Sequence, residues 1–165
     1  MRLIFDLEAD GLYEHADTIW CIVTKDIDTG EVSKWASDLS CDITIALCHL
    51  EEANELIGHN IIDYDLRLIK KLYPSFKLKG LILDTMILSQ LLNPDRKGGH
   101  SLAQYGEELG IKKPEHEDWS KFSPEMLHRC EQDVEINHKV YEQLMNEAYE
   151  DVRGIEYHKV FTNSL

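Results

Sequence analysis

Two acidic side chains at the end of the first apolar segment have the spacing of a metal-binding pair. Asp6 and Glu8 close the segment Met1-Arg-Leu-Ile-Phe-Asp-Leu-Glu8. Residues two apart on a strand point to the same face, so the two carboxylates share a face and Leu7 points to the other. Carboxylates this close repel each other unless a cation neutralises them, and divalent cations prefer oxygen ligands. The pair is either half of a metal site or a solvated strand end.

Two further acids have a context that suits the same site. Asp65 follows the segment Gly58-His59-Asn60 and begins a predicted helix, whereas Asp133 lies inside the last predicted helix among apolar neighbours. A carboxylate buried there is costly unless it is paired or ligated. His128 precedes Asp133 by five residues, about 1.4 turns, so the side chains are offset. They can still converge on one site if that site lies beside the helix.

The elements that must position these residues alternate along the chain. Strands are predicted at 1–8, 18–24, 31–35, 55–60 and 81–84, the second and third forming a hairpin. Helices are predicted at 43–53, 64–72, 85–92, 101–110 and from 123 to about 144 or beyond. The predicted inward stripe of the first helix is Ile45, Leu47, Cys48 and Leu50. This order predicts a mixed sheet flanked by helices, and hence the α/β class.

Composition limits the class of protein. A chain of 165 residues with 43% hydrophobic content fits a single folded domain. No apolar run approaches a membrane span, the N-terminus lacks the regions of a signal peptide, and the four cysteines are scattered. We therefore expect a cytoplasmic protein with reduced cysteines and no membrane partner. The net charge of −14 argues against broad non-specific binding to nucleic acid, but not against gripping a strand end through metals.

The acids stand in the order of a known family. The chain resembles the DEDD 3′–5′ exonucleases, which have a ribonuclease H-like (DnaQ-like) fold. Their first motif, Asp-x-Glu, matches Asp6-Leu7-Glu8. Their second, an Asn followed by an aromatic residue and Asp, matches Asn60 and Tyr64-Asp65. Their third, in its histidine (DEDDh) form, matches His128-Arg-Cys-Glu-Gln-Asp133, and the resemblance covers residues 1 to about 145.

Two positions depart from the family pattern or leave it open. The sequence as a whole looks most like the exonuclease domain of bacteriophage family A DNA polymerases. These domains usually carry Tyr four residues before the last Asp. This chain has Arg129 there, and arginine cannot act as a general base because it stays protonated. Asp63 competes with Asp65 as the second-motif acid, and Asp65 is preferred because it directly follows the aromatic residue.

The resemblance implies a two-metal site of Mg²⁺ or Mn²⁺. Asp6 would bridge both ions, Glu8 and Asp133 would complete one site, and Asp65 would hold the other largely through water. His128 would take the proton from the attacking water.

The resemblance also implies a substrate. Leu12, Asn60 and Tyr64 are the implied substrate contacts, with Leu12 wedged against the terminal base. The expected substrate is a single-stranded or frayed 3′ end of DNA, releasing nucleoside 5′-monophosphates in a bacterial or phage-infected cell. A DNA polymerase or replication protein is a further expected partner. A 3′–5′ exoribonuclease and a non-catalytic proofreading or polymerase-docking module remain the alternatives. Residues 1–150 would form the exonuclease domain and 151–165 a tail or the start of a truncated segment.

Overall fold

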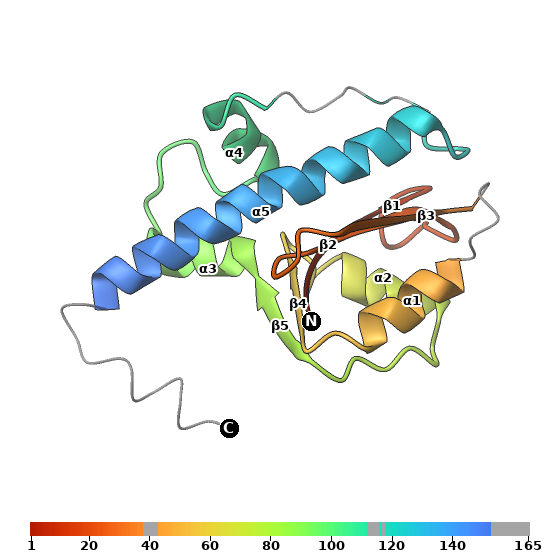
Figure 1. Ribbon diagram of the computed structural model, residues 1–165. Helices are drawn as coiled ribbons and strands as arrows, with labels where there is room; N and C mark the ends of the chain where they lie inside the picture. The colour runs from red at the N-terminus through yellow and green to blue at the C-terminus, as the bar shows by residue number, and fades with distance from the viewer. Residues whose placement is uncertain (38–42, 112–115, 117, 153–165) are drawn as a thin grey trace.

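The computed structural model describes residues 1–37, 43–111, 116 and 118–152. Five strands form one mixed sheet with helices on both faces, as Figure 1 shows. This arrangement confirms the predicted α/β class. The elements are β1 (Arg2–Ala9), β2 (Ile19–Asp26), β3 (Val32–Ala36), α1 (Ile43–Glu51), β4 (Glu55–Gly58), α2 (Asp65–Leu72), β5 (Leu81–Asp84), α3 (Thr85–Leu92), α4 (Leu102–Glu108) and α5 (Pro124–Val152).

The central strand of the sheet is β1. The strand order is β3-β2-β1-β4-β5, in which β1, β2 and β3 are antiparallel neighbours and β4 and β5 run parallel to β1 and to each other. The predicted hairpin of β2 and β3 is confirmed. Strand β4 pairs with β1 only from Arg2 to Ile4. The last residues of β1 therefore extend past the end of β4.

Side chains alternate between the two faces of β1, as its sequence predicts. Leu3, Phe5 and Leu7 are buried in the core that includes residues of α1 and α2. Ile4 is buried on the opposite side, in the core that includes residues of α5. Asp6 and Glu8 follow the period of Ile4, so their side chains point toward α5 rather than toward α1 and α2.

The long helix α5 lies across one face of the sheet (Figure 1). Met126, Cys130 and Val134 pack on that face, and the Cys130 thiol donates a hydrogen bond of 3.3 Å to the carbonyl oxygen of Asp6. Farther along, Ile136 and Val140 form a third core with α3 and α4. Helix α5 is thus buried on more than one side, which fixes its rotation about its own axis.

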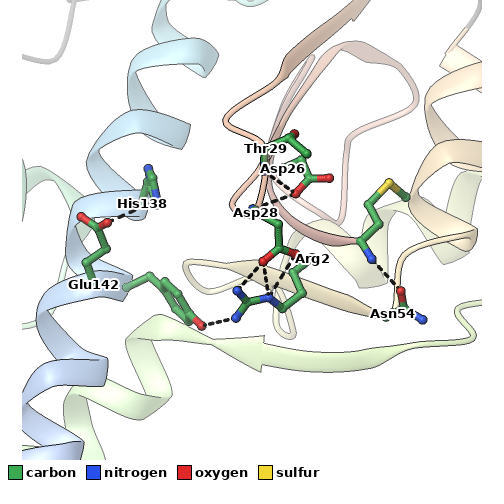
Figure 2. A network of polar contacts seen from close by, with 9 residues as sticks. Arg2, Asp26, Asp28, Thr29, Asn54, His138 and Glu142 are labelled. Atoms are coloured by element: carbon green, nitrogen blue, oxygen red, sulfur yellow. Dashed lines mark hydrogen bonds and ion pairs between the residues drawn. The ribbon is translucent and has the colours of Figure 1, made fainter.

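A network of hydrogen bonds and ion pairs joins α5 to the first residues of β1, far from Glu8 along the strand (Figure 2). Arg2 pairs with Asp28 at 2.5 Å and also donates to the Tyr141 hydroxyl at 3.4 Å. The N-terminal amine donates to the side-chain oxygen of Asn54 at 2.7 Å. Because both side chains of the Arg2–Asp28 pair are exposed, the pair contributes little to the free energy of unfolding.

The inward stripe of α1 differs from the predicted one. Ile43, Ala46, Leu47 and Leu50 are buried. Ile45 is 54% exposed and Cys48 is also exposed, so these two predicted members of the stripe are wrong. Both sets have the three-residue spacing of a helix face, but the face that packs on the core is the one that carries residues 43, 46, 47 and 50. Among the described residues, no helix has the length and apolar character needed to span a membrane.

Candidate active site

Two carboxylates from β1 and one from α5 meet between these two elements. One side-chain oxygen each of Asp6, Glu8 and Asp133 lies within 4.8 Å of the others. Asp133 is only 3% exposed, and the Glu8 side chain is 12% exposed. The predicted shared face of Asp6 and Glu8 brings both toward the helix that carries Asp133.

The carboxylates open into a cleft of about 200 Å³. Strand β1, the loop after β4, the start of α2, the start of α4 and one face of α5 contribute its walls. The lining residues are Asp6, Leu7, Glu8, His59, Asn60, Tyr64, Asp65, Leu102, Arg129 and Asp133. Every predicted site residue is in this list except Leu12 and His128.

Asp65 lines the cleft at the first turn of α2, but it lies outside the group of three close carboxylates. It is 4% exposed and accepts a hydrogen bond from the backbone N–H of Leu7, in the part of β1 that extends past β4. Burial is the main cause that raises the pKa of Asp65 to about 8, and the charges of Glu8 and Asp84 raise it further. In the absence of a cation, this carboxyl is therefore mainly protonated at neutral pH.

The loop after β4 is held by the carboxylate of Asp84. This carboxylate, 6% exposed, accepts backbone N–H bonds from Asn60 at 2.9 Å and from Ile62 at 3.1 Å. It also caps α3. Asn60 has a φ of 64°, and a Cβ on Gly58 would lie 2.0 Å from a methyl carbon of Ile61. The loop therefore needs glycine at 58 and a left-handed residue at 60 to turn the chain into the cleft.

The three predicted substrate contacts have different positions. Asn60 and Tyr64 line the cleft. The Tyr64 hydroxyl donates to the carbonyl of Gly11 at 2.6 Å, and burial is the main cause that raises its pKa to about 12. This bond joins α2 to the segment after β1. Leu12 is 73% exposed and is not among the lining residues, so the structure does not bring it to the cleft.

His128 lies outside the cleft. Its side chain is 59% exposed, with Nδ1 3.9 Å from a carboxylate oxygen of Glu131. The structure does not bring His128 into the cleft beside Asp133, because α5 is a continuous helix and five residues separate their side chains by about 140°. The residue that shares the cleft with Asp133 is Arg129, one turn earlier, whose Nε lies 3.3 Å from Glu8 Oε1.

Sequence reasoning assigned no cleft role to Arg129, His59 or Leu102. The four-residue spacing of Arg129 to Asp133 is the signal that could have placed Arg129 on the same helix face. His59 has its Nδ1 2.9 Å from the Thr85 hydroxyl, and its Nε2 donates to the carbonyl of His100 at 2.7 Å. Nothing in the local sequence marks the approach of Leu102, which comes from the start of α4.

The donor set fits a hard divalent cation. Asp6, Glu8 and Asp133 supply carboxylate oxygens close enough to share one ion, which is the ligand chemistry of Mg²⁺ and Mn²⁺. Neither histidine nor cysteine is part of this cluster, so nothing in it favours zinc. A cation would also offset the mutual repulsion of the three carboxylates.

The sequence matches the RNase_H superfamily over residues 3–126. The chain belongs to this superfamily. It is 24% identical to the DNA-directed DNA polymerase of Escherichia phage T7 over an alignment that covers 89% of this chain, and 23% identical to that of Enterobacteria phage T3. The chain spans 27% of the length of each polymerase. The resemblance found in the sequence is confirmed at the level of the ribonuclease H-like superfamily and its fold.

A solved structure shows how well the fold is shared. Brucella melitensis NrnC with bound Mg²⁺ has a TM-score of 0.68 at 17% identity, covering 98% of this chain and 80% of that one. The same protein bound to pGG has a TM-score of 0.67 at 18% identity. At this identity the likeness concerns the fold, and the chemistry of the cleft is argued from its own residues.

Proposed function

We propose that this chain is a metal-dependent 3′–5′ exonuclease that releases nucleoside 5′-monophosphates from a single-stranded or frayed 3′ end of DNA. The observation that carries the proposal is the cluster of Asp6, Glu8 and Asp133, with oxygens within 4.8 Å of one another at the cleft. Membership in the RNase_H superfamily and the match to phage DNA polymerases support it. A polymerase is a proposed partner on the same ground.

The proposed roles of the acids come from the resemblance, and their places in the cleft support them. Asp6 and Glu8 on β1, with Asp133 on α5, would hold one divalent cation, and Asp65 would contribute to a second. Bound Mg²⁺ or Mn²⁺ would supply an activated water and neutralise charge on the phosphate. Asn60 and Tyr64, on the wall formed by the loop after β4 and the start of α2, would position the terminal nucleotide.

Of the two positions considered for a general base, the cleft contains Arg129 and not His128. His128 as base stays a prediction that the geometry does not favour, because its exposed side chain faces Glu131. Arg129 lines the cleft, but a guanidinium offers only hydrogen-bond donors and cannot serve as a general base. These two positions favour one alternative, a module that binds metal and a nucleic-acid end without hydrolysing it.

The experiment compares the chain with three variants on a 5′-labelled single-stranded DNA, the corresponding duplex and a matching RNA, each with Mg²⁺ or Mn²⁺. The parent should shorten DNA stepwise from its 3′ end. Asp6→Asn and Asp133→Asn should lose at least about 100-fold in rate, because each removes an anionic metal ligand. Asp63→Asn is the matched control, since Asp63 is an exposed acid next to the cleft that is not among its lining residues.

The outcomes separate the alternatives. Hydrolysis of RNA in preference to DNA would identify an exoribonuclease. Metal-dependent binding of the oligonucleotide without shortening would identify the non-catalytic module. An Asp6→Asn protein that digests DNA at the parent rate would contradict the proposal altogether.

A further inference from the structure

The cleft contains one strong cation in an acidic surrounding. Arg129 is the single lysine or arginine among the residues that line it in the described part of the chain. Its side chain is 21% exposed and its Nε lies 3.3 Å from Glu8 Oε1. Its guanidinium carbon also lies 5.6 Å from the centre of the Trp119 ring. Arg129 is thus held between a candidate metal ligand and an aromatic face.

Glu8, the carboxylate that pairs with Arg129, is also a candidate ligand of a divalent cation. Glu8 belongs to the cluster of three carboxylates, whose oxygens suit a divalent ion. A guanidinium and a divalent cation both require the negative charge of this carboxylate, and they repel each other at short range. Binding of the cation therefore weakens the pair of Arg129 with Glu8. The guanidinium fork that leaves a carboxylate is also suited to a phosphate.

We propose that Arg129 is a transferable phosphate ligand. It holds Glu8 while the cluster lacks a cation, and it moves to the phosphate of a bound nucleotide once a cation is present. This inference rests on the proposed function in one respect, namely that the same cleft takes a metal ion and a nucleotide phosphate. It gives the cleft an order of binding, in which the metal ion precedes the nucleotide.

The surroundings of Arg129 suit such a movement. Trp119 is fixed because its carbonyl accepts a hydrogen bond of 2.9 Å from the Trp20 indole, and its ring meets the His116 ring edge-on at 4.8 Å between centroids. The aromatic face therefore stays in place while the guanidinium exchanges one anionic partner for another. The backbone of Arg129 lies within α5, so only the side chain has to change position.

The experiment measures two affinities by calorimetry on the full chain: Mn²⁺ alone, and deoxyadenosine 5′-monophosphate in saturating Mn²⁺. Arg129→Gln should bind Mn²⁺ about ten-fold more tightly, because the competitor for Glu8 is gone. The same variant should bind the nucleotide about ten-fold more weakly, because a charge-assisted hydrogen bond is lost. Opposite shifts in Arg129→Gln, together with weaker nucleotide binding in the charge-conserving Arg129→Lys, are the signature of the transfer.

Two further variants serve as controls. Lys34, on β3, pairs at 2.5 Å with Glu131, which lies on α5 like Arg129 but outside the cleft. Lys34→Gln removes this cation and should change neither affinity. Arg129→Lys keeps the charge but loses the fork, so it should bind Mn²⁺ like the parent and the nucleotide more weakly. If Arg129→Gln fails to fold, Arg129→Lys carries the test, and unchanged nucleotide affinity in it overturns the proposal.

Any result for a folded Arg129→Gln other than tighter Mn²⁺ binding with weaker nucleotide binding overturns the transfer. Loss of positive charge alone would also shift the two affinities in opposite directions, and Arg129→Lys separates this effect from the transfer because lysine keeps the charge. Absence of opposite shifts in a chain that digests DNA overturns this inference alone. Opposite shifts in Arg129→Gln, combined with a parent chain that digests no DNA, overturn the proposed exonuclease activity but not the transfer.

Discussion

Replacing Asp65 by asparagine should change how the stability of the metal-free chain depends on pH. Burial raises the pKa of Asp65 to about 8, from 3.8 for the unperturbed group. Between these values the folded chain keeps a proton that the unfolded chain has lost. The stability due to this group is fully present below about pH 4 and is lost progressively until about pH 8.

The magnitude follows from the linkage of protons to folding. Over that window the free energy of unfolding falls by about 1.4 kcal/mol per pH unit on account of Asp65, hence by as much as about 2.7 kcal/mol from pH 5 to pH 7. The side-chain amide of the Asp65→Asn variant would not titrate, and its oxygen could still accept the N–H of Leu7. The variant should therefore gain stability relative to the parent as the pH rises.

Urea unfolding followed by circular dichroism at pH 5, 6 and 7, with a chelator present, measures the difference. Asp63→Asn is the matched control, because Asp63 lies two residues away with a side chain that is 77% exposed. Its difference from the parent should stay constant over the same pH range. A difference between Asp65→Asn and the parent that is independent of pH, or that falls as the pH rises, would refute the assignment of a protonated, buried Asp65.

Two more expectations concern residues around the cleft. His128→Ala should keep activity within about three-fold of the parent, since this exposed side chain lies away from the cleft, and a loss above about 100-fold in single-turnover kinetics would restore it as the base. Asp84→Ala should lower the free energy of unfolding by about 3 kcal/mol or more, because the N–H groups of Asn60 and Ile62 lose their acceptor. Urea unfolding checks the second expectation, and a cost below about 1 kcal/mol would contradict it.

The elements of the fold could be read from local patterns, because burial on one face imposes a period on each segment. The alternation in β1 placed Asp6 and Glu8 on one face, and the structure shows that face turned toward α5. The same reasoning failed for α1, where Ile45 and Cys48 are exposed, because several apolar residues on a short helix fit more than one stripe.

The cleft was harder to predict than the fold. Its acids were singled out by spacing and context, and the resemblance was needed to join them in one site, since no local pattern reports that residues 6 and 133 meet. The choice between His128 and Arg129 depended on the rotation of α5, which its packing against the sheet and against α3 and α4 fixes. The spacing to Asp133 could have predicted that Arg129 and not His128 lines the cleft, because residues four apart share a helix face and residues five apart do not.

The meeting of the first strand with the last helix also sets when the cluster can exist during synthesis. Asp6 and Glu8 leave the ribosome early, but Asp133 arrives with α5, and the bond of Cys130 to the Asp6 carbonyl spans 124 positions of sequence. Contacts of such separation form late, after the intervening chain is available. A nascent chain that ends before α5 would hold two of the three carboxylates and no complete metal cluster. The growing polypeptide therefore cannot assemble the three-carboxylate cluster until α5 has docked.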